Sequence, residues 1–243
     1  MSTPILIEDS NLSIAWYRVL KYIKAHRGNE ITPLVLSLSA FEEDENIKEI
    51  LDSDLYNNNL DSIDIVSETI FPKSLHEVYG DALFDVYLLK VLPRIKKIDS
   101  RNSGGTYFER LISYGNDGKN QLKIIIDALN DPNSKRRSKL QASIFNPLTD
   151  HKTGVFQGFP CLQHVTFYKS ETGGLILNSF YAMQYLYQRA YGNWLGLINL
   201  GKFVAEETNL EFERFNCFVG VEKLDNLTKT EAGILLDKMS MEE

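Results

Sequence analysis

The chain has 243 residues, 43% hydrophobic and 24% charged, which is typical of a soluble globular protein and excludes collagen, a coiled coil or a disordered chain. Its 33 acidic residues outnumber the 26 basic ones, and the net charge of −7 disfavours binding to nucleic acid or to acidic membranes. With two cysteines, no signal-peptide pattern and no apolar run of about 18 residues, we expect a cytoplasmic protein without a disulfide framework or membrane span.

The first quarter of the chain is predicted to alternate helix and strand. Residues 11–27 carry apolar side chains at helical spacing, and Gly28 follows as a stop signal. Residues 31–39 are apolar and β-rich, which predicts a strand, whereas residues 41–55 carry acidic side chains at helical offsets, which predicts a solvated helix. Residues 60–71 fit either a strand or a helix.

The middle of the chain is predicted to be mainly helical. Apolar positions in residues 75–97 indicate a helix that Pro93 bends or ends. Residues 101–105 form a polar loop that contains glycine. A second helix is predicted over residues 121–129, because the turn cluster Asn-Asp-Pro-Asn that follows stops its continuation.

The C-terminal part of the chain supplies most of the predicted sheet. We expect a strand over residues 140–145, and a hairpin that pairs residues 165–169 with 175–183 across a Glu-Thr-Gly-Gly turn. A helix is predicted over residues 193–207. Since no repeat or linker divides residues 1–243, these elements predict one α+β domain.

Cys161 is a candidate nucleophile. It follows Pro160 where a loop enters a predicted strand, which would hold the thiol at the end of a sheet. Free cysteines are more often inert buried side chains, so this position alone also fits a structural role. His164, three residues later in a strand, would point to the opposite face, so no Cys–His catalytic pair is predicted.

Three further features have both a functional and an ordinary interpretation. Lys135, Arg136 and Arg137 form the densest cationic cluster, which suits a phosphate group or is simply a solvated loop. Glu68, in an otherwise apolar stretch, is either a carboxyl with a raised pKa for proton transfer or an exposed edge residue. Asn193 opens the last predicted long helix and would by default be its N-cap.

Two linked segments resemble the thymidylate synthase family. Residues 121–137 are similar to the family's "Gln-Ile … Leu-x-x-Asp-Pro-x-Ser-Arg-Arg" stretch. Pro160-Cys161, followed by Phe167-Tyr168, resembles its "Pro-Cys-His … Gln-Phe-Tyr" active-site strand, although Leu162 replaces the histidine. Both the order and the spacing of the two segments agree with the family.

Weaker similarities extend the match over residues 60–212. Gly105-Thr-Tyr-Phe-Glu-Arg resembles the family's "Tyr-Gly-x-x-Trp-Arg" element, and Glu68 lies about where the family has its glutamate. Asn193-Trp-Leu-Gly-Leu resembles the start of its "Asn-Ile-Ala-x-Tyr" helix. The resemblance implies a single thymidylate-synthase-like α+β domain with a divergent part over residues 1–60. It also implies a mixed sheet flanked by helices, packing back to back with its copy in a homodimer.

The resemblance implies transfer of a one-carbon unit from 5,10-methylenetetrahydrofolate to C5 of a pyrimidine nucleotide, dUMP in the simplest case. Cys161 would add as a thiolate to C6 of the ring, and Glu68 would manage protons through water. Tyr107 joins them as the third residue that the resemblance assigns to catalysis. There are two alternatives. One is a nucleotide 5-hydroxymethylase, and the other is a nucleotide-binding homologue without folate-dependent catalysis that acts as a sensor or interaction protein.

The resemblance also assigns residues to nucleotide binding. Asn193 would read O4 and N3 of uracil, and Arg136 and Arg137 would hold the phosphate in the partner's active site, so that the homodimer shares its sites. Counted without gaps from Leu175, the family's own-subunit phosphate arginine corresponds to Ala182. Arg189 is a candidate substitute, because Tyr187-Gln-Arg-Ala resembles the family's "Tyr-Gln-Arg-Ser" at a seven-residue displacement.

Overall fold

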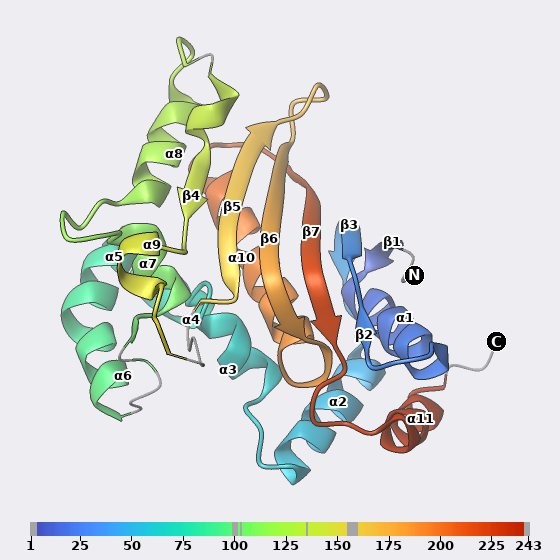
Figure 1. Ribbon diagram of the computed structural model, residues 1–243. Coiled ribbons are helices and arrows are strands. Elements are labelled where there is room, and N and C mark those ends of the chain that lie inside the picture. The colour runs from blue at the N-terminus through green and yellow to red at the C-terminus, as the bar shows by residue number, and fades with distance from the viewer. Residues whose placement is uncertain (1–3, 99–101, 103, 135, 155–159, 241–243) are drawn as a thin grey trace.

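The computed structural model describes residues 4–98, 102, 104–134, 136–154 and 160–240. They form an α+β fold around one mixed seven-stranded sheet with the order β1-β3-β7-β6-β5-β4, in which β2 also pairs with β7 (Figure 1). The strands are β1 (Ile5–Asn11), β2 (Glu30–Ile31), β3 (Leu34–Glu42), β4 (Gln141–Ser143), β5 (Leu162–Lys169), β6 (Leu175–Tyr185) and β7 (Phe212–Lys223). The predicted α+β class and mixed sheet are therefore confirmed.

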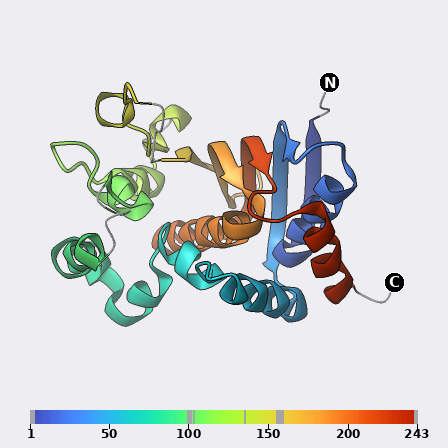
Figure 2. The same cartoon turned by 60° about the horizontal axis from the view of Figure 1, so that its bottom comes forward.

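The helices surround the sheet unevenly. Figures 1 and 2 show α1, α2, α3 and α10 on one face, whereas the other face of the central strands has no helix of the described chain over it. The helices are α1 (Leu12–Ala25), α2 (Glu45–Asn57), α3 (Ile63–Glu68), α4 (Lys73–Tyr79), α5 (Leu83–Val86), α6 (Leu92–Ile98), α7 (Tyr107–Ile112), α8 (Gln121–Asn130), α9 (Pro147–Asp150), α10 (Tyr191–Glu207) and α11 (Lys229–Lys238). None of these helices combines the length and hydrophobicity that crossing a membrane requires.

Strand pairing joins the two ends of the chain in one sheet. The predicted hairpin is confirmed, because β5 and β6 are antiparallel with Val165 opposite Ser179. β6 then runs parallel to β7, and β7 runs antiparallel to β3, which is itself parallel to β1. β1 and β7 were not predicted from the sequence.

Local signals explain several elements well. The helix predicted over residues 11–27 is confirmed as α1, and the Asn11 side chain caps it by accepting a hydrogen bond from the Ile14 N–H at 3.1 Å. The helix predicted over residues 121–129 is confirmed as α8, capped in the same way by Asn120. These helices were predictable because the residues that give the apolar spacing, and the turn residues that end each helix, lie close together in the sequence.

Two helical predictions were wrong. Residues 75–97 do not form one helix, because Gly80 interrupts it with a φ of 48° and a π-helical turn, Tyr87–Val91, precedes α6. Pro93 does not end the helix but is the second residue of α6. Asn193 is not an N-cap: a π-helical turn over Leu186–Ala190 runs directly into α10, and Asn193 is the third residue of that helix.

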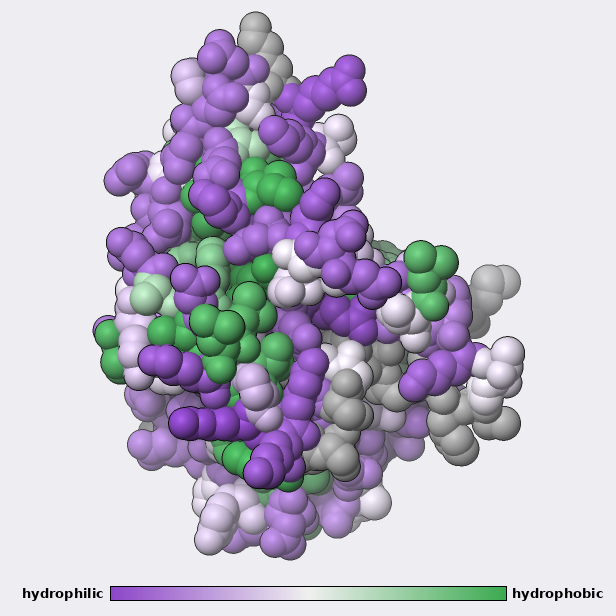
Figure 3. Space-filling view, turned by 90° about the vertical axis from the view of Figure 1, so that its left-hand side faces the viewer, coloured by the Kyte–Doolittle hydropathy of each residue, from purple (hydrophilic) through white to green (hydrophobic). Residues whose placement is uncertain are grey.

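The side of the molecule formed by α4 to α6 leaves apolar side chains uncovered. Val78, Leu89 and Ile98 are exposed there. Figure 3 shows hydrophobic residues gathered over the middle of this side. The apolar surface of these short helices is therefore only partly buried against the rest of the fold.

Helix α10 forms the centre of the helical layer, and 12 of its 17 residues are buried. Two of its glycines let α3 approach closely. A Cβ atom on Gly192 would lie 2.6 Å from the Val66 Cβ, and one on Gly196 would lie 2.6 Å from the Ser67 carbonyl oxygen. The sequence thus places α3, which ends at Glu68, directly against α10.

Substituting Gly192→Ala tests this packing. Alanine is favoured over glycine in an exposed helix by about 1 kcal/mol, but here overpacking against Val66 should outweigh that gain and cost about 1–3 kcal/mol of unfolding free energy. The matched control is Gly233→Ala in α11, where the nearest atom to the new Cβ is the flexible Lys24 Cε at 3.4 Å. Urea denaturation should show Gly192→Ala destabilised and the control stabilised, and equal effects would contradict the close approach of α3.

Candidate functional site

Four residues from separate segments of the chain meet at one cavity of about 250 Å³. Tyr107 opens α7, Cys161 immediately precedes β5, Arg189 lies in the π-helical turn before α10, and Asn193 lies in α10 itself. The remaining residues that line the cavity are Val66, Thr69, Asn102, Gly105, Thr106, Gln184 and Tyr185. We call this hollow the Cys161 cavity.

The start of α7 positions Tyr107. Thr106 and Glu109 form a capping box, in which the Thr106 hydroxyl accepts from the Glu109 N–H at 3.1 Å and the Glu109 carboxylate accepts from the Thr106 N–H. Tyr107 is hydrogen-bonded to the backbone of Leu162 and Cys161. Burial raises the pKa of Tyr107 well above its ordinary value, so its hydroxyl stays protonated at neutral pH.

The two cysteines lie in different environments. Cys217 is fully buried, and burial raises its pKa to about 12. Cys161 is half-buried at the cavity; burial raises the pKa of its thiol, and the Arg189 guanidinium acts in the opposite direction. Cys161 is therefore the accessible thiol, and a neighbouring cation favours its thiolate form.

The Arg189 side chain is fixed by an ion pair but remains partly exposed to solvent. Its guanidinium forms an ion pair with Asp61 at 3.0 Å, and about a third of its side chain remains exposed. The neighbouring Gln188 side chain donates a hydrogen bond to Asp225. Ala182, the position that corresponds to the family arginine in a gap-free count, is exposed on β6 and is not among the residues lining the cavity. Among the described residues, the cationic group that lines the cavity thus comes from the Tyr187-Gln-Arg-Ala string.

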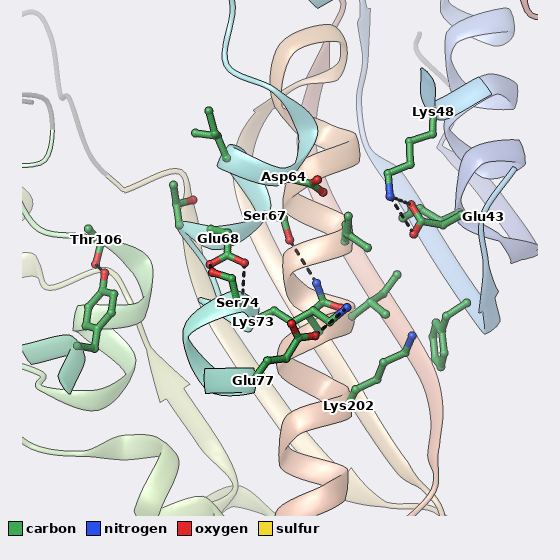
Figure 4. Close-up of a pocket in the computed structure, with 18 of the residues that line it drawn as sticks. Glu43, Lys48, Asp64, Ser67, Glu68, Lys73, Ser74, Glu77, Thr106 and Lys202 are labelled. Carbon is green, nitrogen blue, oxygen red and sulfur yellow. Dashed lines mark hydrogen bonds and ion pairs between the residues drawn. The ribbon is translucent and has the colours of Figure 1, made fainter. Parts of the chain in front are cut away.

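Glu68 lies next to the Cys161 cavity rather than in it. Its two carboxylate oxygens accept hydrogen bonds from the Ser74 backbone N–H and hydroxyl, both at 2.9 Å (Figure 4). It lines a larger groove of about 730 Å³ that shares Thr69, Asn102 and Thr106 with the Cys161 cavity. The two hollows therefore adjoin, with Glu68 on the groove side.

The groove combines apolar walls with charged residues. Leu195 and Ile198 of α10 line it together with Tyr87 and Ile95. Figure 4 shows three lysines around it: Lys48 pairs with Glu43 at 3.1 Å, Lys73 pairs with Glu77 at 3.5 Å, and Lys202 lies over the Phe41 ring at 5.8 Å. Glu43, Asp64, Glu68 and Glu77 line the groove as well, so a long ligand with a flat apolar part and polar or charged ends suits this arrangement.

The predicted arginine pair lies elsewhere in the chain. Arg136 and Arg137 follow α8, are exposed, and are not among the residues that line the Cys161 cavity. Arg137 lies over the Tyr168 ring at 5.9 Å. Lys135 lies outside the described residues.

The sequence analysis missed one polar wall residue, Gln184. It is 2% exposed near the end of β6 and lines the Cys161 cavity. Its position between Met183 and Tyr185 resembles no motif, so only the burial of the strand end identifies it. Among the described residues, no group of three or more His, Cys, Asp or Glu side chains could hold a metal ion.

No protein-family model matches the sequence, and no curated protein matches it either.

The electrostatic effect of Arg189 on Cys161 can be measured directly. We expect Arg189→Gln to raise the pKa of Cys161, because the cation that favours the thiolate is lost. The pH profile of iodoacetamide alkylation, followed by mass spectrometry, should then move to higher pH. Arg137→Gln is the control, since Arg137 is exposed and outside the cavity. An unchanged profile in Arg189→Gln would show that the guanidinium does not influence the thiol.

Proposed function

We propose that the protein transfers a one-carbon unit to C5 of a pyrimidine nucleotide, with dUMP as the simplest substrate, through a covalent adduct on Cys161. The observation that carries this proposal is the convergence of Tyr107, Cys161, Arg189 and Asn193 on one cavity, although they lie up to 86 positions apart in the sequence (193 minus 107). The resemblance of the sequence to thymidylate synthases supplies the reaction class.

The cavity residues suit the first chemical step. The Cys161 thiolate attacks C6 of the pyrimidine, so that an S–C6 bond forms and the C5=C6 electron pair moves to C5, stabilised as an enolate at O4. Arg189 favours the thiolate and attracts an anionic substrate. Tyr107, which stays protonated, and the Asn193 amide can both donate hydrogen bonds to ring oxygens that gain charge.

Glu68 supports proton movement from the adjoining groove. Its carboxylate is half-buried and fixed by Ser74, and Thr69 and Thr106 lie on both hollows. A chain of hydroxyls and waters across this shared wall could connect the carboxylate with the pyrimidine ring. Glu68 would therefore act through intervening groups rather than by direct contact with Cys161.

The groove fits 5,10-methylenetetrahydrofolate. When bound, the folate supplies the one-carbon unit that is joined to C5. Leu195, Ile198 and Tyr87 offer apolar surface for its flat ring, and the Lys202 ammonium suits one of its carboxylates, whereas Lys48 and Lys73 already pair with glutamates of the groove. Since the groove adjoins the Cys161 cavity, we expect a ligand bound in the groove to lie next to the nucleotide.

We further propose that the uncovered sheet face forms a homodimer. Phe180 and Phe218, on the paired strands β6 and β7, are each 41% exposed and stack at 5.5 Å between ring centroids. Stacked exposed aromatic rings are typical of interfaces rather than of solvated sheets. A partner docked back to back would bring its own Arg136 and Arg137 within reach of the nucleotide phosphate, as the resemblance implies.

Covalent trapping tests the proposed reaction. The protein is incubated with 5-fluoro-dUMP, with and without methylenetetrahydrofolate, and the intact mass is measured. We expect a folate-dependent adduct in the wild type, because fluorine replaces the C5 hydrogen and cannot be lost as a proton is, and no adduct in Cys161→Ser. Cys217→Ser should keep the adduct, since Cys217 is buried away from the cavity. Reversible binding of the nucleotide without any adduct would support the sensor alternative instead.

The dimer has its own test. Phe180→Glu places a charge on the stacked pair and should convert the protein to a monomer in sedimentation velocity experiments, with loss of the adduct because the partner's arginines are removed. Leu148→Glu is the control, since Leu148 is 92% exposed in α9 and not on the sheet. A wild-type protein that sediments as a monomer at micromolar concentration would contradict the shared site.

A further inference from the structure

Gln184 is buried without the partners that a buried amide normally has. Its side chain is 2% exposed, and neither its amide oxygen nor its amide nitrogen has a hydrogen-bond partner among the described residues. Buried amides are nearly always paired, because leaving them unpaired costs folding free energy. Since Gln184 also lines the Cys161 cavity, a bound ligand is the natural source of the missing partners.

Gln184 lies next to other buried polar groups. Glu222 on β7 is paired with Gln184 in the parallel register of β6 and β7, is fully buried, and has no hydrogen-bond partner among the described residues. Burial raises the pKa of Glu222 well above its ordinary value, which favours the neutral form of its carboxyl. The Tyr181 hydroxyl is likewise buried and unpartnered within the described chain. Of these three residues only Gln184 lines the cavity.

Arg189 and Gln184 would favour one orientation of a ligand in the cavity. Arg189 presents a cation, which suits the anionic end of a ligand, whereas Gln184 presents one hydrogen-bond donor and one acceptor without charge. A carboxamide of this kind complements a ring edge with an adjacent N–H and C=O. Uracil has such an edge on either side of N3.

Resting on the proposed function, we infer that Gln184 is a specificity-determining residue that recognises the base of the nucleotide through hydrogen bonds from its amide to an adjacent N–H and C=O of a uracil-type ring. The amide has no partner within the described chain of the free protein and is paired in the complex. Gln184 therefore lowers the stability of the free protein and raises its affinity for the nucleotide, as is common for binding-site residues.

Calorimetric titration of Gln184→Met tests the recognition. Methionine has a similar length but lacks both hydrogen-bonding atoms. We expect the variant to bind dUMP about tenfold or more weakly, the loss that one or two neutral hydrogen bonds account for. Its affinity for 2-deoxyribose 5-phosphate, which lacks the base, should stay within about twofold of wild type, since the phosphate contacts are unchanged. An equal loss for both ligands, or no loss for dUMP, would overturn the inference.

Melting of the free protein gives a second, ligand-independent measurement. Gln184→Met should melt at a higher temperature than wild type, because it removes two unpaired buried atoms. Gln121→Met is the matched control and should melt lower, since the Gln121 amide makes three hydrogen bonds, to Arg110 O, Ser143 O and Ser143 N–H. A lower melting temperature for Gln184→Met would show that its amide stabilises the fold and would overturn the inference.

The inference and the proposed function fail in different ways. If the wild type binds dUMP but forms no Cys161 adduct with 5-fluoro-dUMP, the proposed transfer reaction is wrong. Base recognition by Gln184 is still supported if Gln184→Met selectively loses affinity for dUMP. If the adduct forms in Gln184→Met with unchanged dUMP affinity, only the inference fails. A wild-type protein that does not bind dUMP overturns both.

Discussion

The packing of α10 between the sheet and α3 is the constraint on which the site depends. Gly192 and Gly196 have no side chain to hold α3 away, so the segment that carries Val66 and Thr69 lies against the helix that carries Asn193. The preceding π-helical turn places Arg189 one turn earlier on the same wall. Because β6 leads directly into this turn, the strand ends and the helix start converge on Cys161. A local steric requirement of two glycines thus organises residues from four segments.

Burial and charge act against each other in the Cys161 cavity. Removing water raises the pKa values of Cys161 and Tyr107, which keeps both groups protonated, and Arg189 is the charge that shifts the thiol back toward its reactive form. Burial likewise raises the pKa of Glu222, which is paired with Gln184 in the sheet, and so favours its neutral form. In our proposal the site gains its chemistry from this contrast, since Arg189, the one charged side chain among the described residues that line the cavity, both orients an anionic ligand and activates the nucleophile.

The sequence analysis predicted elements with local signals and missed those without them. α1, α8 and the β5–β6 hairpin were predictable from apolar spacing, caps and a glycine turn. β1 was missed although it has seven residues, because its position depends on pairing with β3. The N-cap assigned to Asn193 was wrong because a π-helical turn continues upstream, a feature with no clear sequence signal. For the site, the residue types were identified, but the choice between the Ala182 and Arg189 positions needed the three-dimensional arrangement.

The sequence by itself determined the α+β class, the strong local elements and the candidates for chemistry, because these depend on residue type and on contacts within a few positions. Only the tertiary structure decided which candidates share a cavity. It brought Arg189 and Asn193 to Cys161, placed Glu68 beside Ser74 in the adjoining groove, and buried the Gln184 amide without a hydrogen-bond partner among the described residues. The physical reason is that these relationships arise from strand pairing and helix packing between residues far apart in the chain, which no short-range pattern records.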